Sequence, residues 1–259
     1  MIRIFLNRKE KEQVEKLLLA DLRDAETGPW KQLEDNRSFI ENGYPEVAKE
    51  LYDNGEVKED NLKKLLLADR KTMKEYIKKF SPDFDWNDKN RKKVLKNDLK
   101  QWKKIFNFEA YGTRKAVRSI LTTMRVDVCP YCNRIFTAVS PKSGTRPPLD
   151  HYYPKSRYPY LALTLYNLIP CCSECNRQKT STVIKQKEKQ IIHPYYDDFS
   201  KETWIFARLI EGDPIVFEFY VQCPKEWDEI KKERAKNHFE EFKLNELYSP
   251  YAAEESIEC

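Results

Sequence analysis

Two Cys-x-x-Cys pairs constrain this chain more than any other feature of its 259 residues. Cys129 and Cys132 form the first pair, and Cys172 and Cys175 form the second. Each pair can place two thiolates on one turn, and four thiolates complete the tetrahedral shell of a structural zinc ion. Such a shell leaves no open position for a reacting molecule. The spacing therefore predicts a zinc ion that acts as a scaffold and closes the segment 133–171.

Polar groups suited to hydrolysis lie within this segment and directly after it. Asp150 and His151 are adjacent, and Asn176 follows the last cysteine. A neutral imidazole, with a pKa near about 6.5, can deprotonate a water molecule near neutral pH. A carboxylate and an amide carbonyl offer the oxygen ligands that a hard divalent ion prefers. The residues thus predict a second, catalytic metal site on Asp150 and Asn176, beside a histidine base.

The order of these residues closely resembles the HNH endonucleases, also called the ββα-metal or His-Me finger superfamily. The resemblance covers residues 129 to 179 and implies a metal-binding acid at Asp150, a general base at His151, a loop-fixing residue at Asn167 and a last metal ligand at Asn176. The matching phrases are Cys129-Pro-Tyr-Cys132, Asp150-His151-Tyr-Tyr-Pro154-Lys155-Ser156, Asn167-Leu-Ile-Pro170 and Cys172-Ser-Glu-Cys175-Asn176.

The last letter of the HNH name is not matched, because Asn176 stands where a histidine is usual. The phage resolvase branch of the superfamily is similar in this respect. An amide oxygen is a harder ligand than imidazole, so the change favours Mg²⁺ or Mn²⁺ over zinc or nickel at the catalytic position.

The resemblance implies an enzyme that hydrolyses phosphodiester bonds, with DNA as the expected substrate and RNA left open. Small HNH proteins with these phrases resemble the nuclease partners of ATPases in bacterial anti-phage systems of the Septu type. We therefore expect a role in antiviral defence and an ATPase partner. Two alternatives remain: a zinc ribbon that binds nucleic acid without cutting it, and an interaction subunit without autonomous nuclease activity. Asp150, His151 and Asn176 separate the first alternative from a nuclease, because binding alone does not require them.

The pattern of apolar residues predicts an α+β fold with three parts. These are a mostly helical lobe over 1–125, which binds a partner or nucleic acid, a zinc-stapled ββα-metal core over 126–199, and a hairpin with a helix over 200–259. In the first part, Asn7 and Glu10 form a plausible helix-capping pair. Apolar residues at helical spacing predict one long helix from Leu62 to Phe80.

Two β-hairpins are expected after residue 125. In the first, Arg134–Val139 pairs with Leu149–Tyr152 across a Gly- and Pro-containing loop. In the second, 204–210 pairs with 215–221, and a charged helix over 226–242 follows. Ser173 is the expected N-cap of the helix beside the second cysteine pair.

Positive charge is concentrated in one stretch of the chain. The net charge is +5, but Asn87 to Arg118 holds eleven Lys or Arg against three Asp or Glu, with Trp102 and Phe106 among them. Such a stretch can neutralise phosphates, and a solvated helix face is an equally good interpretation. Arg157, Arg177 and Lys179 flank the motif and are candidate phosphate contacts, with ordinary surface charge as the alternative.

The remaining cysteines, histidines and tyrosines receive structural interpretations. We expect Cys171 to be a buried thiol or bystander and His193 to be a packing residue. His238 lies on the charged helix and is expected to be solvated. The tyrosines at 152, 153, 158 and 160 either stack on bases or, more often in a small lobe, form the core. Cys223 and Cys259 have no predicted role.

Composition predicts a soluble, cytoplasmic protein. Charged residues make up 34% of the chain, and its apolar runs fall short of a membrane span. The apolar start of the chain, Met1 to Asn7, is too brief for a secretory signal. Seven cysteines, four of them at metal-ligand spacing, favour a reducing compartment over a disulfide scaffold.

Overall fold

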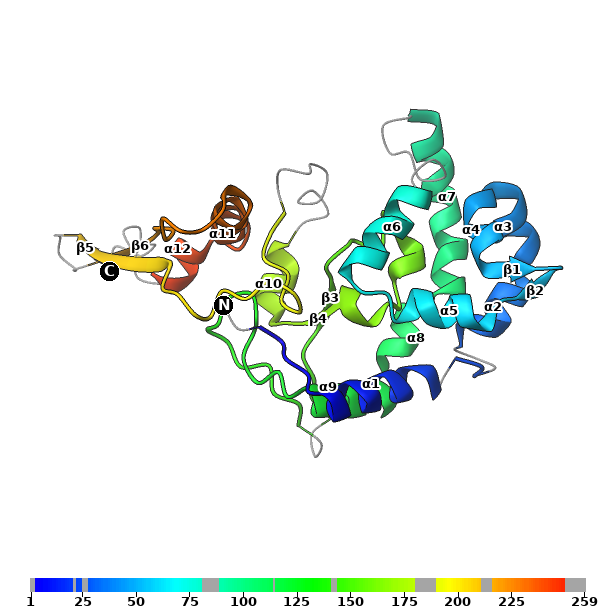
Figure 1. Cartoon of the computed structure of the whole chain (residues 1–259), viewed down its shortest axis with the longest axis horizontal. Helices are drawn as coiled ribbons and strands as arrows, with labels where there is room; N and C mark the ends of the chain where they lie inside the picture. The colour runs from blue at the N-terminus through cyan, green and yellow to red at the C-terminus, as the bar shows by residue number, and fades with distance from the viewer. Residues whose placement is uncertain are drawn as a thin grey trace, which may run out of the picture. The chain divides into compact units, whose positions relative to one another are not determined.

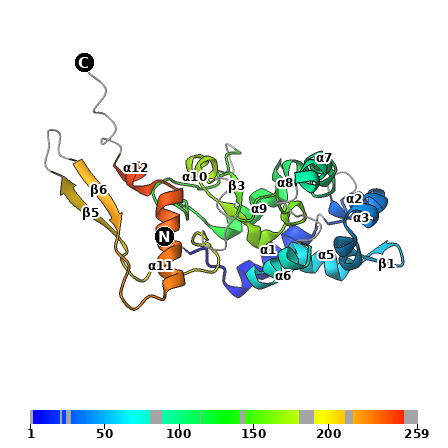
Figure 2. The ribbon, with the colours of Figure 1, turned by 90° about the horizontal axis from the view of Figure 1, so that it is seen from above.

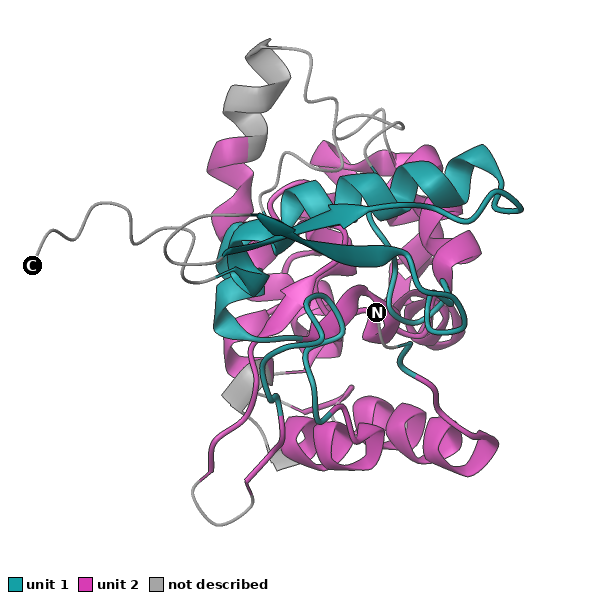
Figure 3. Cartoon of the chain, turned by 90° about the vertical axis from the view of Figure 1, so that its left-hand side faces the viewer, with its two compact units in different colours: residues 1–4, 127–137, 171–259 teal, residues 5–126, 138–170 magenta. Residues whose placement is uncertain are grey.

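The computed structural model describes residues 3–20, 22–24, 28–80, 89–113, 115–140, 144–179, 190–210 and 216–249. Over these ranges the chain is α+β, with helices and small antiparallel two-stranded sheets (Figure 1), which confirms the predicted fold class. Internal contacts divide it into two units (Figure 3), unit 1 with residues 1–4, 127–137 and 171–259, and unit 2 with residues 5–126 and 138–170. The predicted core segment 126–199 contributes to both units. The contacts therefore group the residues differently from the three expected parts, and the division into those parts stays a prediction.

Unit 2 begins with a helix whose start is set by side-chain caps. In α1 (Arg8–Ala20), the Glu10 amide donates to Asn7 Oδ1 at 3.0 Å, and the Asn7 amide donates to Glu10 Oε2 at 2.9 Å. This reciprocal pair confirms the predicted capping. Val14 and Leu18 are buried on one face, and α1 packs along α9 (Lys115–Met124), as Figure 1 shows.

Short helices and a tight hairpin follow α1 in unit 2. Asn54 and Gly55 join the two strands of the hairpin with φ values of 48° and 83°, as a type I′ turn requires. Because side chains other than Asn and Asp rarely adopt these angles, the Asn-Gly pair fixes this turn. The elements are α2 (Pro29–Asp35), α3 (Arg37–Gly43), α4 (Pro45–Leu51), β1 (Tyr52–Asp53) and β2 (Glu56–Val57).

The single long helix expected from Leu62 to Phe80 is wrong. The structure has α5 (Glu59–Leu66) and α6 (Arg70–Phe80), separated by a break at 67–69. Asp69 causes the restart, because its carboxylate accepts the Thr72 amide at 2.8 Å and so caps α6. Apolar spacing alone missed this cap, since both helices bury the same kind of face. The expected stop at Ser81-Pro82 lies outside the described residues.

The basic stretch forms α7 (Lys89–Ile105), α8 (Phe108–Thr113) and α9. Trp102 and Phe106 are each 1% exposed and stack on one another, and Trp102 also meets Tyr44 edge to face at 4.9 Å. These rings are core. The described lysines of α7 stay exposed, so phosphate binding and simple solvation both remain open for their charge.

The first predicted hairpin pairs differently from the expectation. β3 (Leu149–His151) pairs antiparallel with β4 (Leu168–Pro170), not with Arg134–Val139. The Arg134–Val139 segment folds back on the residues before it, because the Ile135 carbonyl accepts the Cys129 amide and the Thr137 amide donates to the Asp127 carbonyl. Its backbone groups are therefore already used. The chain order is still strand, strand, helix: β3, β4 and α10 (Ser173–Gln178).

The tyrosines between β3 and β4 belong to the core of unit 2. Tyr152, Tyr153 and Tyr160 are at most 5% exposed, which confirms the core interpretation for them. Tyr160 lies in η2 (Pro159–Leu161) and meets Phe80 edge to face at 4.9 Å. A second 3-10 turn, η3 (Leu165–Asn167), leads into β4.

Unit 1 contains the second predicted hairpin, which is confirmed. β5 (Ile205–Ile210) and β6 (Val216–Val221) pair antiparallel in register from Ile205–Val221 to Ile210–Val216. Figure 2 shows the hairpin beside α11 (Glu229–Glu241) and α12 (Leu244–Tyr248). Its base packs on a buried cluster of Ile192, Phe199, Trp204, Trp227 and Ala235. In the described part of the chain, no helix is both long and apolar enough to cross a membrane.

His238 on α11 is fully buried, so the expectation of a solvated side chain is wrong. Its Nε2 donates to the carbonyl of Tyr131 at 2.7 Å, and its ring packs on Phe242. Burial lowers the pKa of His238 to about 3, and its Nδ1 has no hydrogen-bond partner among the described residues. Protonation would therefore place an unsatisfied charge in the core of unit 1.

We predict that His238 makes the protein acid-sensitive. The unfolded chain binds a proton at this histidine below about pH 6.5 and the folded chain only near pH 3, so stability falls as the pH drops through this window. Between about pH 7.5 and about pH 5, this group should remove about 2 kcal/mol from the free energy of unfolding. Urea titrations of the wild type and His238→Gln at both pH values measure the loss. An equal loss in the two proteins contradicts the prediction.

Candidate metal centre and active site

Four buried cysteines form one cluster in unit 1. The sulfur atoms of Cys129, Cys132, Cys172 and Cys175 all lie within 4.8 Å of one another, and those of Cys132 and Cys172 are 4.0 Å apart. All four are free thiols in the structure. Zn–S bonds of about 2.3 Å place the sulfur atoms of a tetrahedral site about 3.8 Å apart. The cluster therefore fits a structural zinc ion by number, donor type and spacing.

The first cysteine pair lies in a tight knuckle. The Asn133 amide donates to the Cys129 carbonyl at 2.7 Å, and the Cys129 amide donates to the Ile135 carbonyl at 2.8 Å. Asn133 has a φ of 52°, a left-handed conformation that asparagine tolerates better than most side chains. These bonds turn the chain at once after Cys132 and bring both thiols to one side.

The second pair lies at the start of α10. The N-cap is Cys172 and not the expected Ser173: its sulfur accepts the Cys175 amide at 3.4 Å. Hydrogen bonding from Cys129 lowers the pKa of Cys172 to about 7, and the same partner lowers the pKa of Cys132. Hydrogen bonds within the cluster raise the pKa of Cys129 and Cys175, so two of the four sulfur atoms favour the thiolate form and two favour the thiol. Cys171 is equally buried but lies outside the cluster, as predicted.

Two side chains from the C-terminal helices contact the knuckle. The Tyr248 hydroxyl donates to the Cys132 carbonyl, and His238 donates to the Tyr131 carbonyl. Burial raises the pKa of Tyr248 well above its ordinary value, so the phenol stays a donor. The metal-binding loop is therefore fixed by α11 and α12. Nothing at the level of sequence motif marked these two positions.

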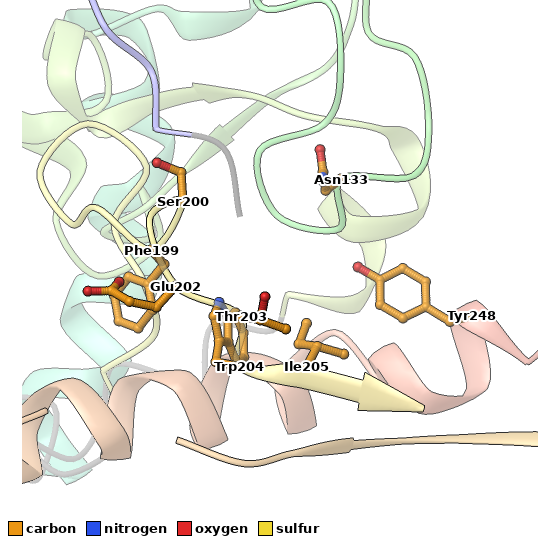
Figure 4. Close-up of a pocket in the computed structure, with 8 residues that line it drawn as sticks. All are labelled: Asn133, Phe199, Ser200, Glu202, Thr203, Trp204, Ile205 and Tyr248. Carbon is orange, nitrogen blue, oxygen red and sulfur yellow. The ribbon is translucent and has the colours of Figure 1, made fainter. Parts of the chain in front are cut away.

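A cavity of about 330 Å³ adjoins the knuckle in unit 1 (Figure 4), with Tyr248 and Asn133 at one side. Its described lining contains no Lys or Arg, and its carboxylate, Glu202, pairs with Lys231 at 3.5 Å. Such a lining gives little attraction for phosphate. The lining residues are Asn133, Phe199, Ser200, Glu202, Thr203, Trp204, Ile205 and Tyr248.

Asp150 and His151 lie on β3 in unit 2, at 7% and 8% exposure. His151 Nε2 lies 3.0 Å from the Ala162 carbonyl oxygen. Because a carbonyl only accepts, Nε2 must carry the proton, and the lone pair of the neutral ring is then on Nδ1. Phe108 contacts the imidazole edge to face at 4.4 Å, so the ring is held on a second side. This arrangement presets one tautomer and one orientation.

Asn167 is fully buried and connects both ends of the loop after β3. Its Oδ1 accepts the Tyr153 amide at 2.7 Å, and its Nδ2 donates to the carbonyls of Tyr153 and Leu161 at 3.1 and 3.0 Å. These are the bonds that a loop-fixing residue makes. They hold the loop that ends one residue before Ala162, the partner of His151. Any part of Asn167 in a reaction stays a prediction.

Asn176 lies on α10 in unit 1, with an exposed side chain. Asp150 and His151 belong to unit 2. The carboxylate of Asp150 and the amide oxygen of Asn176 suit a hard divalent ion by donor type. A catalytic metal on Asp150 and Asn176 would draw on both units, and it stays a prediction.

The three predicted phosphate contacts differ in exposure. Arg177 is exposed, Arg157 is half-buried, and Lys179 is only 9% exposed. Burial leaves Lys179 less available to a nucleic acid than the two arginines. Contact with nucleic acid stays a prediction for all three.

Two arginines that the sequence motifs did not single out lie together in unit 2. The Arg118 guanidinium would lie 3.4 Å from a Cβ on Gly144, two residues before Arg146. Burial lowers the pKa of Arg146, and the charge of Arg118 lowers it further. Arg146 Nη1 donates to the Pro147 carbonyl at 3.0 Å, a neutral partner that leaves its charge unpaired by this bond. Such a pair of like charges is suited to an anion such as phosphate. Their separation in the sequence hid them.

His193 is fully buried, which confirms the packing interpretation. Its ring contacts Tyr196 at 4.7 Å, and its Nδ1 accepts the Tyr195 amide at 3.4 Å. All three histidines of the chain are thus buried, and they differ in what their rings contact.

Comparisons with known proteins find partial relatives. The chain is 31% identical to protein ea31 of Escherichia phage lambda over 151 residues, which make up 56% of this chain and 48% of that protein. It is 33% identical to the Septu protein PtuB of Bacillus thuringiensis over 64 residues, 25% of this chain and 24% of that protein. The chain thus spans half or less of the length of these relatives. No family model and no solved structure matches. The PtuB match agrees with a link to Septu-type defence, and neither name states a reaction.

We expect the purified protein to contain one zinc ion, and Cys132→Ser to lose it. A three-thiol site binds zinc more weakly, and folding of the knuckle is coupled to metal binding, so the thermal midpoint should also fall. Metal content by mass spectrometry and thermal unfolding measure both effects. Cys171→Ala is the matched control, equally buried but outside the cluster, and should keep its zinc. A folded, zinc-free Cys132→Ser protein with an unchanged midpoint contradicts the assignment.

Proposed function

We propose that this chain is a metal-dependent HNH endonuclease that hydrolyses phosphodiester bonds of DNA. The observation that carries the proposal is the 3.0 Å hydrogen bond between His151 Nε2 and the Ala162 carbonyl. It leaves the lone pair of the neutral ring on Nδ1, the state that a general base needs. Asp150, the preceding residue on β3, adds a carboxylate to the same strand.

In the proposed reaction, His151 Nδ1 takes a proton from the water that attacks phosphorus in line with the leaving 3′ oxygen. Asp150 and the amide oxygen of Asn176 would hold Mg²⁺ or Mn²⁺, because both offer oxygen ligands. When bound, such an ion offsets the charge that builds on the phosphate. Asn167 acts by position, since it fixes the loop next to Ala162.

Zinc is the proposed scaffold in this enzyme, on Cys129, Cys132, Cys172 and Cys175. The thiolates saturate the ion, so no substrate can reach it. Their buried, closely spaced sulfur atoms support this assignment.

Phosphate groups of the substrate are the proposed ligands of Arg118 and Arg146. Arg157 and Arg177 are further candidates, because they flank the motif and are not fully buried. Contacts to phosphates position a nucleic acid without reading its sequence. DNA is the expected substrate, and RNA is an outcome of the cleavage assay.

We further propose that the protein acts in bacterial anti-phage defence, with an ATPase as partner. The similarity of a quarter of the chain to a Septu protein supports this role. In such an assembly the ATPase would control access to the nuclease site. The mostly helical part of unit 2 is the proposed binding region for this partner.

We predict that His151→Ala lowers the rate of plasmid cleavage in Mg²⁺ by at least about a hundredfold, the usual contribution of a general base. Zinc content should stay unchanged, because His151 lies in unit 2 and the cysteine cluster in unit 1, and the variant should still fold. Supercoiled plasmid, single-stranded DNA and RNA are each incubated with Mg²⁺, Mn²⁺ or EDTA, alone and with the co-expressed partner. His193→Gln removes a different buried imidazole and should keep its activity.

Full activity of His151→Ala refutes the base assignment. The zinc-loaded wild type could also bind nucleic acid without cutting it, both by itself and with the partner. This result would favour a zinc-ribbon protein that only binds nucleic acid. Cleavage that needs the partner assigns the protein as the nuclease subunit of an assembly.

We predict that Arg118→Gln and Arg146→Gln weaken DNA binding mainly at low salt. Removal of one phosphate interaction should reduce the slope of log affinity against log salt by about 0.9. Fluorescence anisotropy across salt concentrations measures the slope. Arg208→Gln is the control, because Arg208 already pairs with Glu218. An unchanged slope in both test variants contradicts the phosphate assignment.

A further inference from the structure

A small, mostly apolar cavity of about 170 Å³ lies in unit 2. One wall is α7 with the start of α8, and the other is the loop after β3 with η2, against which α7 packs. The lining residues are Leu99, Trp102, Lys103, Phe106, Glu109, Lys155, Ser156, Pro159 and Ala162. The cavity therefore combines apolar side chains with two lysines, a carboxylate and a hydroxyl.

The volume of this cavity suits one aromatic ring. An apolar cavity of roughly 150 Å³ accommodates a benzene molecule. The six-membered ring of a pyrimidine has nearly that size, whereas the fused rings of a purine are larger. Leu99, Pro159 and Ala162 give apolar contacts to such a ring, and the buried rings of Trp102 and Phe106 lie among the same lining residues. Size and lining thus favour a pyrimidine over a purine.

The polar groups of the cavity can tell one pyrimidine from another. Glu109 accepts a hydrogen bond from Lys155 at 2.7 Å, and this bond lowers the pKa of the Glu109 carboxyl. Glu109 therefore stays ionised and can only accept hydrogen bonds. Cytosine presents an amino group as a donor at its fourth ring position, and thymine presents a carbonyl there. A carboxylate at the rim favours cytosine.

Positive charge at the rim suits the phosphate that comes with a base. Lys103 is exposed and lines the cavity, and Lys155 lies with its Nζ 4.6 Å from the centre of the Phe108 ring. With Glu109 the rim carries a net charge of one positive unit. A nucleotide is thus better suited to this cavity than an uncharged aromatic molecule.

The cavity adjoins the proposed base. Ala162, which lines it, is the residue whose carbonyl binds His151 Nε2. Phe108, which contacts the His151 ring, also lies under Lys155. Ala162 would therefore be the residue between a ring in the cavity and the imidazole of His151. A nucleotide bound there would be close to the phosphate under attack.

We propose that this cavity binds an unpaired cytosine next to the cleavage position. The base must leave its stack to enter, so the preferred substrate has a single-stranded or extruded cytosine at this place. Its placement near the cut rests on the proposed nuclease function, whereas the binding of the base does not. The cavity then acts as a specificity site.

Binding of mononucleotides in EDTA tests the cavity without any cleavage. The wild type should bind dCMP about tenfold more tightly than dAMP in isothermal titration calorimetry. Leu99→Trp fills the cavity from α7 and should weaken dCMP binding about tenfold. Lys100→Trp adds the same side chain at the next, exposed position of α7, outside the lining, and should change binding by less than about twofold.

Glu109→Ala tests whether the Glu109 carboxylate recognises the amino group of cytosine. The variant should bind dCMP and dTMP with affinities equal to within about twofold, whereas the wild type should prefer dCMP. The proposal is overturned if the wild type binds dCMP and dAMP equally, if it binds neither, or if Leu99→Trp binds dCMP as tightly as the wild type does. The first two results are measured on the wild type alone, so they do not depend on the folding of a variant. If the protein binds cytosine but never cuts nucleic acid, the cavity assignment stands and the nuclease proposal is refuted. If it cuts nucleic acid without any base preference, the nuclease proposal stands and the cavity assignment is refuted.

Discussion

Convergence of four thiols is the interaction on which the proposed site depends. The cluster joins two short turns that are far apart in the sequence, at Cys129–Cys132 and Cys172–Cys175. Closing a loop of this length costs several kcal/mol of chain entropy, and a zinc ion bound by four thiolates can offset that cost. In the segment between the turns, the regular elements of the described residues are short: β3, β4 and the 3-10 turns η2 and η3, each of three residues. Asp150, His151 and Asn167 all lie in this segment.

The second constraint is the hydrogen-bond chain that positions His151. Asn167 joins the Tyr153 backbone to the Leu161 carbonyl, and the next residue, Ala162, accepts from the imidazole. One buried amide thus fixes the loop, and the loop fixes the tautomer of the ring. A loosely held histidine would sample both tautomers. Only the tautomer with its lone pair on Nδ1 can act as the base while Nε2 binds the Ala162 carbonyl.

Local rules predicted the parts of the molecule that depend on local chemistry. The Asn7–Glu10 cap and the second hairpin are confirmed because each depends on neighbouring residues. The meeting of the two cysteine pairs is confirmed for another reason, since a structural zinc ion needs four ligands and each local pair supplies two. Strand pairing failed, because the knuckle used the backbone of Arg134–Val139, which the spacing of polar and apolar residues does not reveal. The burial of His238 was missed for a related reason: the charges around it on α11 outweighed its spacing from other apolar residues. The Arg118–Arg146 pair arises only once the chain has folded.

The central claim is that His151 is held as a neutral base with its lone pair on Nδ1. Nitrogen-15 NMR of the imidazole side chains in the zinc-loaded protein tests this directly, with the His151 signals assigned by their disappearance in His151→Ala. Near neutral pH the account predicts a protonated Nε2 and an unprotonated Nδ1. A proton on Nδ1, or an average of both tautomers, would contradict it.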